Sequence, residues 1–372
     1  MALFATDIAT TFFGSPTPEA VASVSQLGTW NTLTESIITL LLSVLVIKFR
    51  HKSLFLVGSA FIIFSAIGSY FAPSLLFLQV FYIIEGVGSV IISIISMTII
   101  ADALPEKNKA QTIGYMYSMG AAATLVIMPI VGFLTNAGGW RAGLVSIVMP
   151  FALLGLITSL LLLPPKINRK TQFSSNPILE SFRKITKTRS AIACLVANLF
   201  IVQGSEVAVF ALAFYRIQFL ATRDITVLIY EISLILFLLG PIFSGRIIDR
   251  FGAKKTAVST TFLAACCTGA IFFVPNFWVA TAFDMIHVWF AAMAIPAFAL
   301  IVLDQVPSSR GTMFSLSSFF NNIGKDIAPL LGGTILALSS GLYGAVGLTL
   351  SSMTIIGCII IIVAVKTPTQ KE

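Results

Sequence analysis

The sequence predicts an all-α membrane protein made of two six-helix bundles, and three observations support this fold class. The chain is 57% hydrophobic and only 10% charged, which is more apolar than the core of a soluble protein of this length requires. Its apolar residues gather in repeated runs, each long enough to cross roughly 30 Å of hydrocarbon as a helix. The loops between these runs alternate between basic and nearly uncharged, which is typical of the two sides of a membrane.

Eleven apolar runs of helical length follow one another, and the start of the chain suggests a twelfth. The twelfth candidate, 1–14, is too short to span a membrane at about 1.5 Å of rise per residue. We therefore expect a truncated first helix or a start codon further upstream. The eleven runs cover residues 27–48, 53–72, 74–103, 110–136, 141–163, 191–219, 225–246, 255–274, 277–303, 311–336 and 342–365.

One connection is much longer than the others and divides the chain into halves. Residues 164–190 are polar, basic and interrupted by proline, so they are predicted to form a cytoplasmic linker. It would join an N-terminal bundle of residues 1–163 to a C-terminal bundle of residues 191–372.

The basic residues indicate the orientation of the chain in the membrane. Of the 23 Lys and Arg residues, 19 lie in alternate loops and at the C-terminus, and the positive-inside rule places that set in the cytoplasm. Both termini are then cytoplasmic if the first helix is complete, and we expect a multi-pass protein of the plasma membrane. The formal charge of +8 is spread over short loops and not over one face, which argues against a nucleic-acid partner.

The two halves repeat each other in sequence. In ADALPEKNKA (101–110), Asp102 and Pro105 lie 202 positions before Asp304 and Pro307 of LDQVPSSRG (303–311). A repeat of about six helices in the same orientation predicts two bundles related by an axis along the membrane normal.

The segment GRIIDRFGAKK (245–255) carries five charges in eleven residues. It resembles the G-x-x-x-D-R-x-G-x-[KR]-[KR] loop of the major facilitator superfamily, and weaker likeness, as in EGVGS (85–89) and GGWR (138–141), extends over nearly the whole chain. The resemblance implies twelve helices around a central cavity, alternating access, and a gating function for this loop. The residues to which it assigns gating are Gly245, Asp249, Arg250 and Gly252.

An alternative for this loop is a positive-inside anchor. That alternative accounts for its bases but not for Asp249, because an acid weakens an anchor. The matching first-half segment carries Ile47 where the acid would stand. If a latch exists here, only the second half carries it.

Ionisable residues inside the apolar runs are the candidates for proton coupling or substrate binding, because each is costly to place in a membrane. The alternative for each is a structural hydrogen bond between helices. Lys325 and Asp326 are adjacent, so they form either a self-neutralising buried pair or, through Lys325, a site for an anionic group. The full set is Glu35, Glu85, Glu206, Glu231, Asp284, His287, Lys325 and Asp326.

Asp284 and His287 are three residues apart, which places them on one face of a helix. The repeat offset of 202 positions sets His287 opposite Glu85. The family resemblance implies that Glu85, Glu206, Asp284 and His287 come from helices that line the central cavity. Carboxyl and imidazole groups at such a place could take up and release a proton in each cycle.

These features favour a secondary transporter that exports a small amphipathic compound in exchange for protons, acting as a monomer in the lipid bilayer. The alternative is uptake of an organic anion or another metabolite, with Lys325 and His287 as the recognising cations. A receptor or scaffold that does not transport is less favoured. The two histidines, His51 and His287, and the other side chains form no nucleophile–base or metal cluster, so neither an enzyme nor a cofactor is expected.

Overall fold

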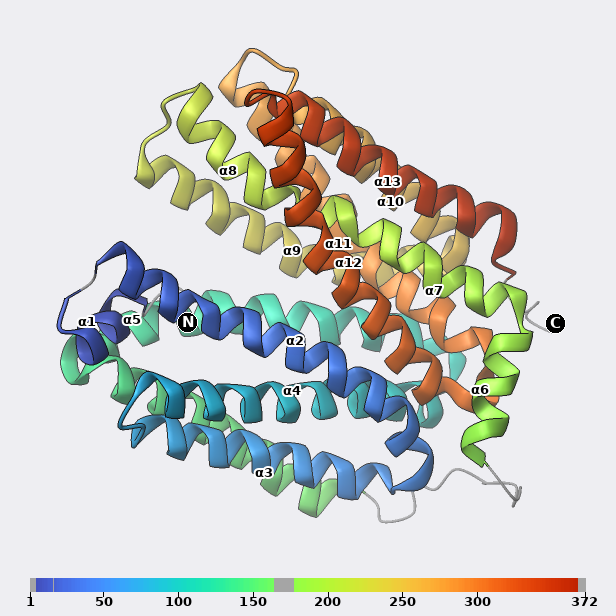
Figure 1. Cartoon of the computed structure of the whole chain (residues 1–372). Helices are drawn as coiled ribbons and strands as arrows, with labels where there is room; N and C mark the ends of the chain where they lie inside the picture. Colours follow the sequence, from blue (N-terminus) through green and yellow to red (C-terminus); the bar gives the residue numbers. More distant parts are fainter. Residues whose placement is uncertain (1–4, 16, 164–176, 367–372) are drawn as a thin grey trace. The chain divides into compact units, whose positions relative to one another are not determined.

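The computed structural model describes residues 5–15, 17–163 and 177–366, and the regular elements in these ranges are all helical. Figure 1 shows them along the chain. The first half contains α1 (Ala5–Phe13), α2 (Pro18–Lys48), α3 (His51–Tyr70), α4 (Leu75–Ala103) and α5 (Glu106–Leu162). The second half contains α6 (Pro177–Lys187), α7 (Arg189–Ile201), α8 (Val207–Gln218), α9 (Arg223–Phe251), α10 (Ala253–Ile271), α11 (Phe277–Gln305), α12 (Arg310–Leu338) and α13 (Tyr343–Ala364), with 3₁₀ segments η2 (Val202–Glu206) and η3 (Pro307–Ser309).

The predicted all-α fold is confirmed for the described residues, with changes at several helix ends. Helix α2 begins at Pro18, well before the predicted position 27, because Thr17 caps it: the amide of Ala20 donates to Thr17 Oγ1 over 3.3 Å. A hydroxyl at the N-cap and a proline in the first turn both favour a helix start. Helix α5 contains both of the runs predicted there, which are separated at Gly139, where φ is +77°.

The linker prediction falls partly outside the described residues, because 164–176 belong to the undescribed ranges. Residues 177–187, which lie within the predicted linker, form helix α6. Its proline stands in the first turn, where the missing N–H costs nothing, and Glu180 and Lys184 form an ion pair one turn apart at 2.6 Å. The linker is therefore helical next to the second half.

Eight helical stretches in the described ranges are long and apolar enough to cross a membrane. The predicted count of twelve also includes α1, the first part of α5, α10 and α12. Helix α10 is less apolar because it is rich in threonine, and Thr260 and Thr268 donate back to the carbonyls of Thr256 and Ala264. Such bonds satisfy hydroxyl groups within the helix itself. The eight stretches are Trp30–Lys48, His51–Tyr70, Leu75–Ala103, Gly138–Leu162, Arg189–Gln218, Asp224–Phe251, Phe277–Gln305 and Tyr343–Ala364.

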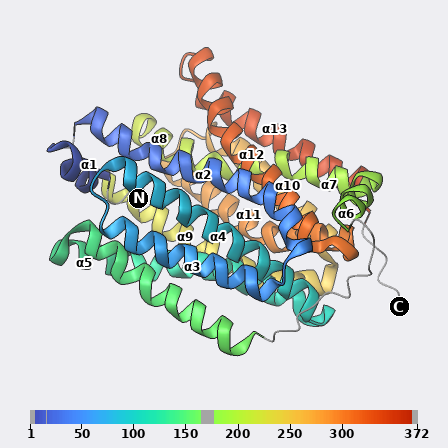
Figure 2. The ribbon, with the colours of Figure 1, turned by 60° about the horizontal axis from the view of Figure 1, so that its bottom comes forward.

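The chain forms two compact units, each with its own core. Unit 1 comprises Met1–Ile99 and Val126–Ile178, and unit 2 comprises Ile100–Leu125 and Leu179–Glu372. In unit 1, helices α2, α3 and α4 run alongside one another in both views (Figures 1 and 2). The core residues of unit 1 include Leu27, Leu78 and Trp140.

The core of unit 2 is rich in aromatic side chains. Phe214 of α8 meets Phe272 edge to face, with ring centroids 5.2 Å apart, an arrangement that aromatic rings prefer. Tyr215, next to Phe214, is fully buried in the same cluster. This cluster holds α8 firmly against its neighbours and so positions Tyr215.

Two lysines show that the sequence repeat is also a structural repeat. Lys52 Nζ donates to the carbonyls of Leu160 and Leu163, each over 2.8 Å. Lys254 Nζ, 202 positions later, donates to the carbonyls of Ile362 and Val365, also 202 positions later. In each half a lysine thus caps the carbonyl end of the last helix, where a positive charge is stabilised by the unpaired carbonyls.

Candidate functional site

Unit 2 contains a cavity of about 160 Å³ between α8, α9 and α11. Its α11 wall is formed by Asp284, His287, Val288, Ala291 and Ile295. The spacing of these residues, three, four, seven and eleven positions after the first, places them on one helix face. The predicted shared face of Asp284 and His287 is therefore confirmed, and it lines a cavity.

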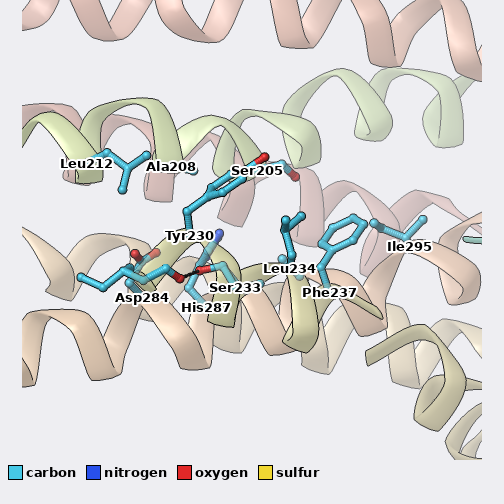
Figure 3. A pocket seen from close by; sticks show the side chains of 13 residues that line it. Ser205, Ala208, Leu212, Tyr230, Ser233, Leu234, Phe237, Asp284, His287 and Ile295 are labelled. Atoms are coloured by element: carbon cyan, nitrogen blue, oxygen red, sulfur yellow. Dashed lines mark hydrogen bonds between the residues drawn. The ribbon is translucent and has the colours of Figure 1, made fainter. Parts of the chain in front are cut away.

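The other walls are mostly apolar, and their polar groups are hydroxyls. Ser205 and Tyr230 are exposed although they line the cavity, so it opens to the outside of unit 2 beside them. Figure 3 shows how these side chains lie. The residues of η2, α8 and α9 that line the cavity are Ser205, Ala208, Leu212, Ile229, Tyr230, Ser233, Leu234 and Phe237.

Asp284 is 4% exposed and is held on one side only. The hydroxyl of Tyr215 donates to Asp284 Oδ2 over 3.1 Å and approaches the carbonyl of Ala280 at 3.3 Å. Asp284 Oδ1 has no hydrogen-bond partner in the part of the chain that the structure describes. A buried carboxylate is costly without a cation or donor beside it, so this buried oxygen lacks the proton or positive charge that would stabilise it.

His287 is 3% exposed, and its ring is oriented by α10. Its Nδ1 lies 3.1 Å from the carbonyl of Ala264 and 2.9 Å from Thr268 Oγ1. Because a carbonyl only accepts, this contact assigns a proton to Nδ1. The opposite nitrogen, Nε2, is then the one left to the cavity as an acceptor.

The helix break at η2 places Ser205 at the cavity. Residues 202–206 form a 3₁₀ segment between α7 and α8, which changes the direction of the side chains that follow. The Gln203 amide donates to the carbonyls of Leu199 and Gly324 over 3.2 and 3.0 Å, so it joins η2 to α7 and α12, while Gln203 Oε1 has no hydrogen-bond partner among the described residues. An interrupted helix at the membrane interior is a recurrent feature of solute sites.

Four predicted residues of unit 2 lie away from this cavity wall. Glu206 is half-buried and interacts electrostatically with Lys325 and Asp326. Lys325 is exposed and Asp326 half-buried, so the interpretation as a buried pair is wrong. Glu231 is exposed on α9, next to the cavity residue Tyr230.

The two acids of unit 1 lie between α2 and α4. Asn31 Nδ2 donates to the carbonyl of Tyr82 over 2.9 Å and to Glu85 Oε2 over 3.4 Å. Ser89 donates to Glu35 Oε1 over 3.4 Å. Glu85 and Glu35 therefore each make a hydrogen bond between α2 and α4, which is the structural alternative to proton coupling.

The segment 245–255 forms the end of α9 and the start of α10. Gly245 lies against α5: a Cβ placed on it would be 2.8 Å from Gln111 Cα. Gly252 has φ +84°, which only glycine adopts readily. Asp249 and Arg250 are exposed, and Asp249 has no hydrogen-bond or ion-pair partner among the described side chains.

Arg310, which the sequence analysis did not select as a site residue, contacts both acids of the sequence repeat. Arg310 Nη1 donates to the carbonyl of Ala101 over 2.8 Å and lies 3.4 Å from Asp102 Oδ1. Its Nη2 lies 3.8 Å from Asp304 Oδ1. The sequence predicts Asp102 and Asp304 only as matching positions of the repeat, and their offset of 202 is the one sequence signal for this ionic cluster.

Tyr215, Tyr230, Ser205 and Ser233 were also missed as site residues. Hydroxyl groups are cheap to bury compared with charges, so a search for costly ionisable groups passes over them. Their approach to Asp284 and His287 depends on the packing of α8 and α9 against α11, which no spacing within one helix reveals.

These features define a multi-pass membrane protein with a solute-sized, partly polar cavity inside one helical unit. The sequence model of the Major Facilitator Superfamily matches residues 1–230 and 207–372, which together span the chain. The chain belongs to this superfamily of transporters, as the resemblance of its loop and repeat predicted.

Solved transporters share the fold. The chain superposes on a crystal structure of the Escherichia coli fucose:proton symporter FucP with a TM-score of 0.81 and 14% identity, covering 98% of this chain and 95% of that one. It superposes on the proton:xylose symporter XylE, bound to 6-bromo-6-deoxy-D-glucose, with a TM-score of 0.77 and 16% identity, covering 98% and 94%. At these identities the likeness shows the fold alone.

A sequence relative is the uncharacterized MFS-type transporter YvkA of Bacillus subtilis (strain 168). It is 24% identical over 147 residues, which are 39% of this chain and 33% of the relative. The chain thus matches about a third of that protein's length.

Proposed function

We propose that this protein moves a small amphipathic compound across the plasma membrane by alternating access, coupled to protons at Asp284 and His287, and that it exports the compound. One observation carries the proposal: a buried carboxyl with an unpartnered oxygen and an oriented imidazole line the same, mostly apolar cavity. Both groups change protonation without leaving the protein interior, which is what coupling needs.

The solved relatives support protons as the coupling ion, because the printed descriptions of FucP and XylE name proton symport of fucose and of xylose. Symport moves the solute in the same direction as the proton, so these two relatives favour uptake, which is the second candidate function. The version of uptake in which Lys325 and His287 recognise an organic anion has less support, since Lys325 is exposed and lies outside the cavity wall. Import and export are therefore opposite outcomes of one experiment.

The proposal also covers gating, which we assign to Gly245, Asp249, Arg250 and Gly252. It further places both termini in the cytoplasm and takes the protein to act as a monomer. The close approach of Gly245 to α5 supports the gating part, because a glycine there lets two helices slide at short distance. The bundles 1–163 and 191–372 are proposed as the two bodies that rock.

The test uses the full chain in proteoliposomes with a pH indicator inside and an imposed pH gradient. Addition of a panel of small amphipathic compounds should cause proton movement with the wild type, and its sign distinguishes export from uptake. Asp284→Asn should strongly lower coupled proton movement, whereas the matched control Asp224→Asn, at an exposed acid in the first turn of α9, should not. Coupled flux in Asp284→Asn that stays close to the wild-type rate would refute this coupling site.

A further inference from the structure

We infer that the ligand of the unit 2 cavity is a small organic amine in its cationic form, with an apolar body about the size of one aromatic ring. This inference rests on the proposed function in taking the cavity as the substrate site. It adds the chemical class, which follows from the volume of the cavity, the order of its residues and the kind of polar atoms that face it.

The volume sets the size of the part of the ligand that lies inside unit 2. The cavity holds about 160 Å³, and an engineered protein cavity of about 150 Å³ binds benzene. A single ring, or an aliphatic group of that size, therefore fills it. Because the cavity opens beside Ser205 and Tyr230, a larger ligand would extend out of it there.

The titratable residues lie toward one end of the cavity, and the other end is apolar. Figure 3 shows Asp284 and Leu212 at one end and Phe237 and Ile295 at the other, with His287 and Ser233 between. On α11, Asp284 and Ile295 are eleven residues apart, which is about 16 Å along the helix axis. A ligand with one polar head and an apolar body matches this order.

The titratable side chains present acceptors to the cavity, and the hydroxyls of Ser205 and Tyr230 can both donate and accept. Asp284 Oδ1 has no donor within the described ranges, and His287 leaves Nε2 to the cavity because Nδ1 faces Ala264. Ser233 donates its proton to the carbonyl of Ile229 over 2.9 Å, so its lone pairs also remain. An ammonium group offers three N–H donors and a positive charge, which is what these acceptors lack.

Anions and sugars fit the same wall poorly. Of the described residues that line the cavity, none is Lys or Arg, so a carboxylate or phosphate would meet Asp284 without a counter-charge. A sugar carries several hydroxyl groups, and an apolar wall such as Leu212, Leu234 and Phe237 would leave them unpaired. The fold shared with sugar symporters therefore does not extend to the chemistry of this cavity.

The test is ligand binding by the purified full-length protein in detergent, measured by thermal shift and calorimetry. Benzylamine is the probe, with benzyl alcohol as its neutral isostere, benzoate as the anion, and L-fucose and D-xylose as sugars. We expect benzylamine to bind at least tenfold more tightly than benzyl alcohol, and benzoate and both sugars to give no shift. A ligand that binds the native state raises the melting temperature in proportion to its affinity.

Two variants locate the binding. Asp284→Asn should lower benzylamine affinity at least tenfold while leaving benzyl alcohol binding within about threefold, a change in selectivity that loss of folding would not produce. Ala291→Phe should block binding of both ligands by filling the cavity. Because this variant keeps the Asp284 carboxyl, it also tests the site if Asp284→Asn does not fold.

Preference for benzoate or a sugar over benzylamine would overturn the inference, and so would an unchanged benzylamine affinity in Asp284→Asn. Binding of benzylamine without coupled proton movement in proteoliposomes would instead contradict the proposed function and leave the ligand class standing. Coupled proton movement with other compounds, but no binding of benzylamine, would contradict the ligand class and leave the proposed function standing.

Discussion

Glu85 in unit 1 and His287 in unit 2 lie 202 positions apart, at matching places in the repeat, yet their surroundings differ. Glu85 accepts a hydrogen bond from Asn31 on the neighbouring helix, next to Gly86, where a Cβ would lie 2.8 Å from Asn31 Nδ2. His287 faces a cavity instead, with Asp284 one turn away. An ionisable group in an apolar helix therefore indicates a functional site only when packing leaves space beside it.

The sharpest way to break this comparison is to neutralise the acid of unit 2. Asp284→Asn should lower coupled transport by about 10- to 100-fold, because a hydrogen bond to a charged group contributes about 1.5–3 kcal/mol and each 1.4 kcal/mol is about tenfold. Initial rates of proton movement in proteoliposomes measure it. A loss below threefold would place the site elsewhere.

A stability measurement tests the structural part of unit 1. Asn31→Ala removes the donor to the carbonyl of Tyr82 and to Glu85. Leaving such groups unsatisfied should cost about 1–3 kcal/mol, read as a lower midpoint of thermal unfolding. An unchanged midpoint would show that these contacts do not hold α2 to α4.

The two lysine caps offer a pair of equivalent changes. Lys52→Met and Lys254→Met each remove two bonds to carbonyls at a helix end. Each should destabilise by about 0.5–1.5 kcal/mol, the usual net contribution of a hydrogen bond at a partly exposed place. Midpoints that differ strongly between the two variants would contradict the structural repeat.

The smallest effect is expected from Glu85→Gln. The amide oxygen of glutamine accepts the hydrogen bond from Asn31 in place of the carboxylate. The melting temperature and the rate of coupled transport should therefore stay close to wild type. We expect the rate to change by less than about threefold, which corresponds to less free energy than a typical hydrogen bond contributes. The same proton-flux assay applies. Loss of coupling in this variant would move unit 1 into the proton path and remove the contrast between the units.

Much of the fold could be predicted because it follows from local patterns. Apolar runs, the repeat of Asp102 at Asp304, and the loop at 245–255 depend on neighbours in sequence. The same reasoning selected Asp284 and His287 together, since three residues along one helix share a face. Reasoning from local patterns was wrong about the burial of Lys325, because its exposure depends on which helices surround α12. It did not select Arg310 or Tyr215, because their partners come from distant segments of the chain.

The sequence by itself determined the class of protein, the repeat and the helices, because burial of apolar side chains in a membrane and helical periodicity act over short stretches. Only the tertiary structure decided which ionisable groups have space beside them. Packing of α8 and α9 against α11 leaves a cavity at Asp284, whereas packing of α2 against α4 leaves Glu85 in contact with Asn31. The physical reason is that a cavity depends on how side chains of separate helices fill space, and one helix does not encode that.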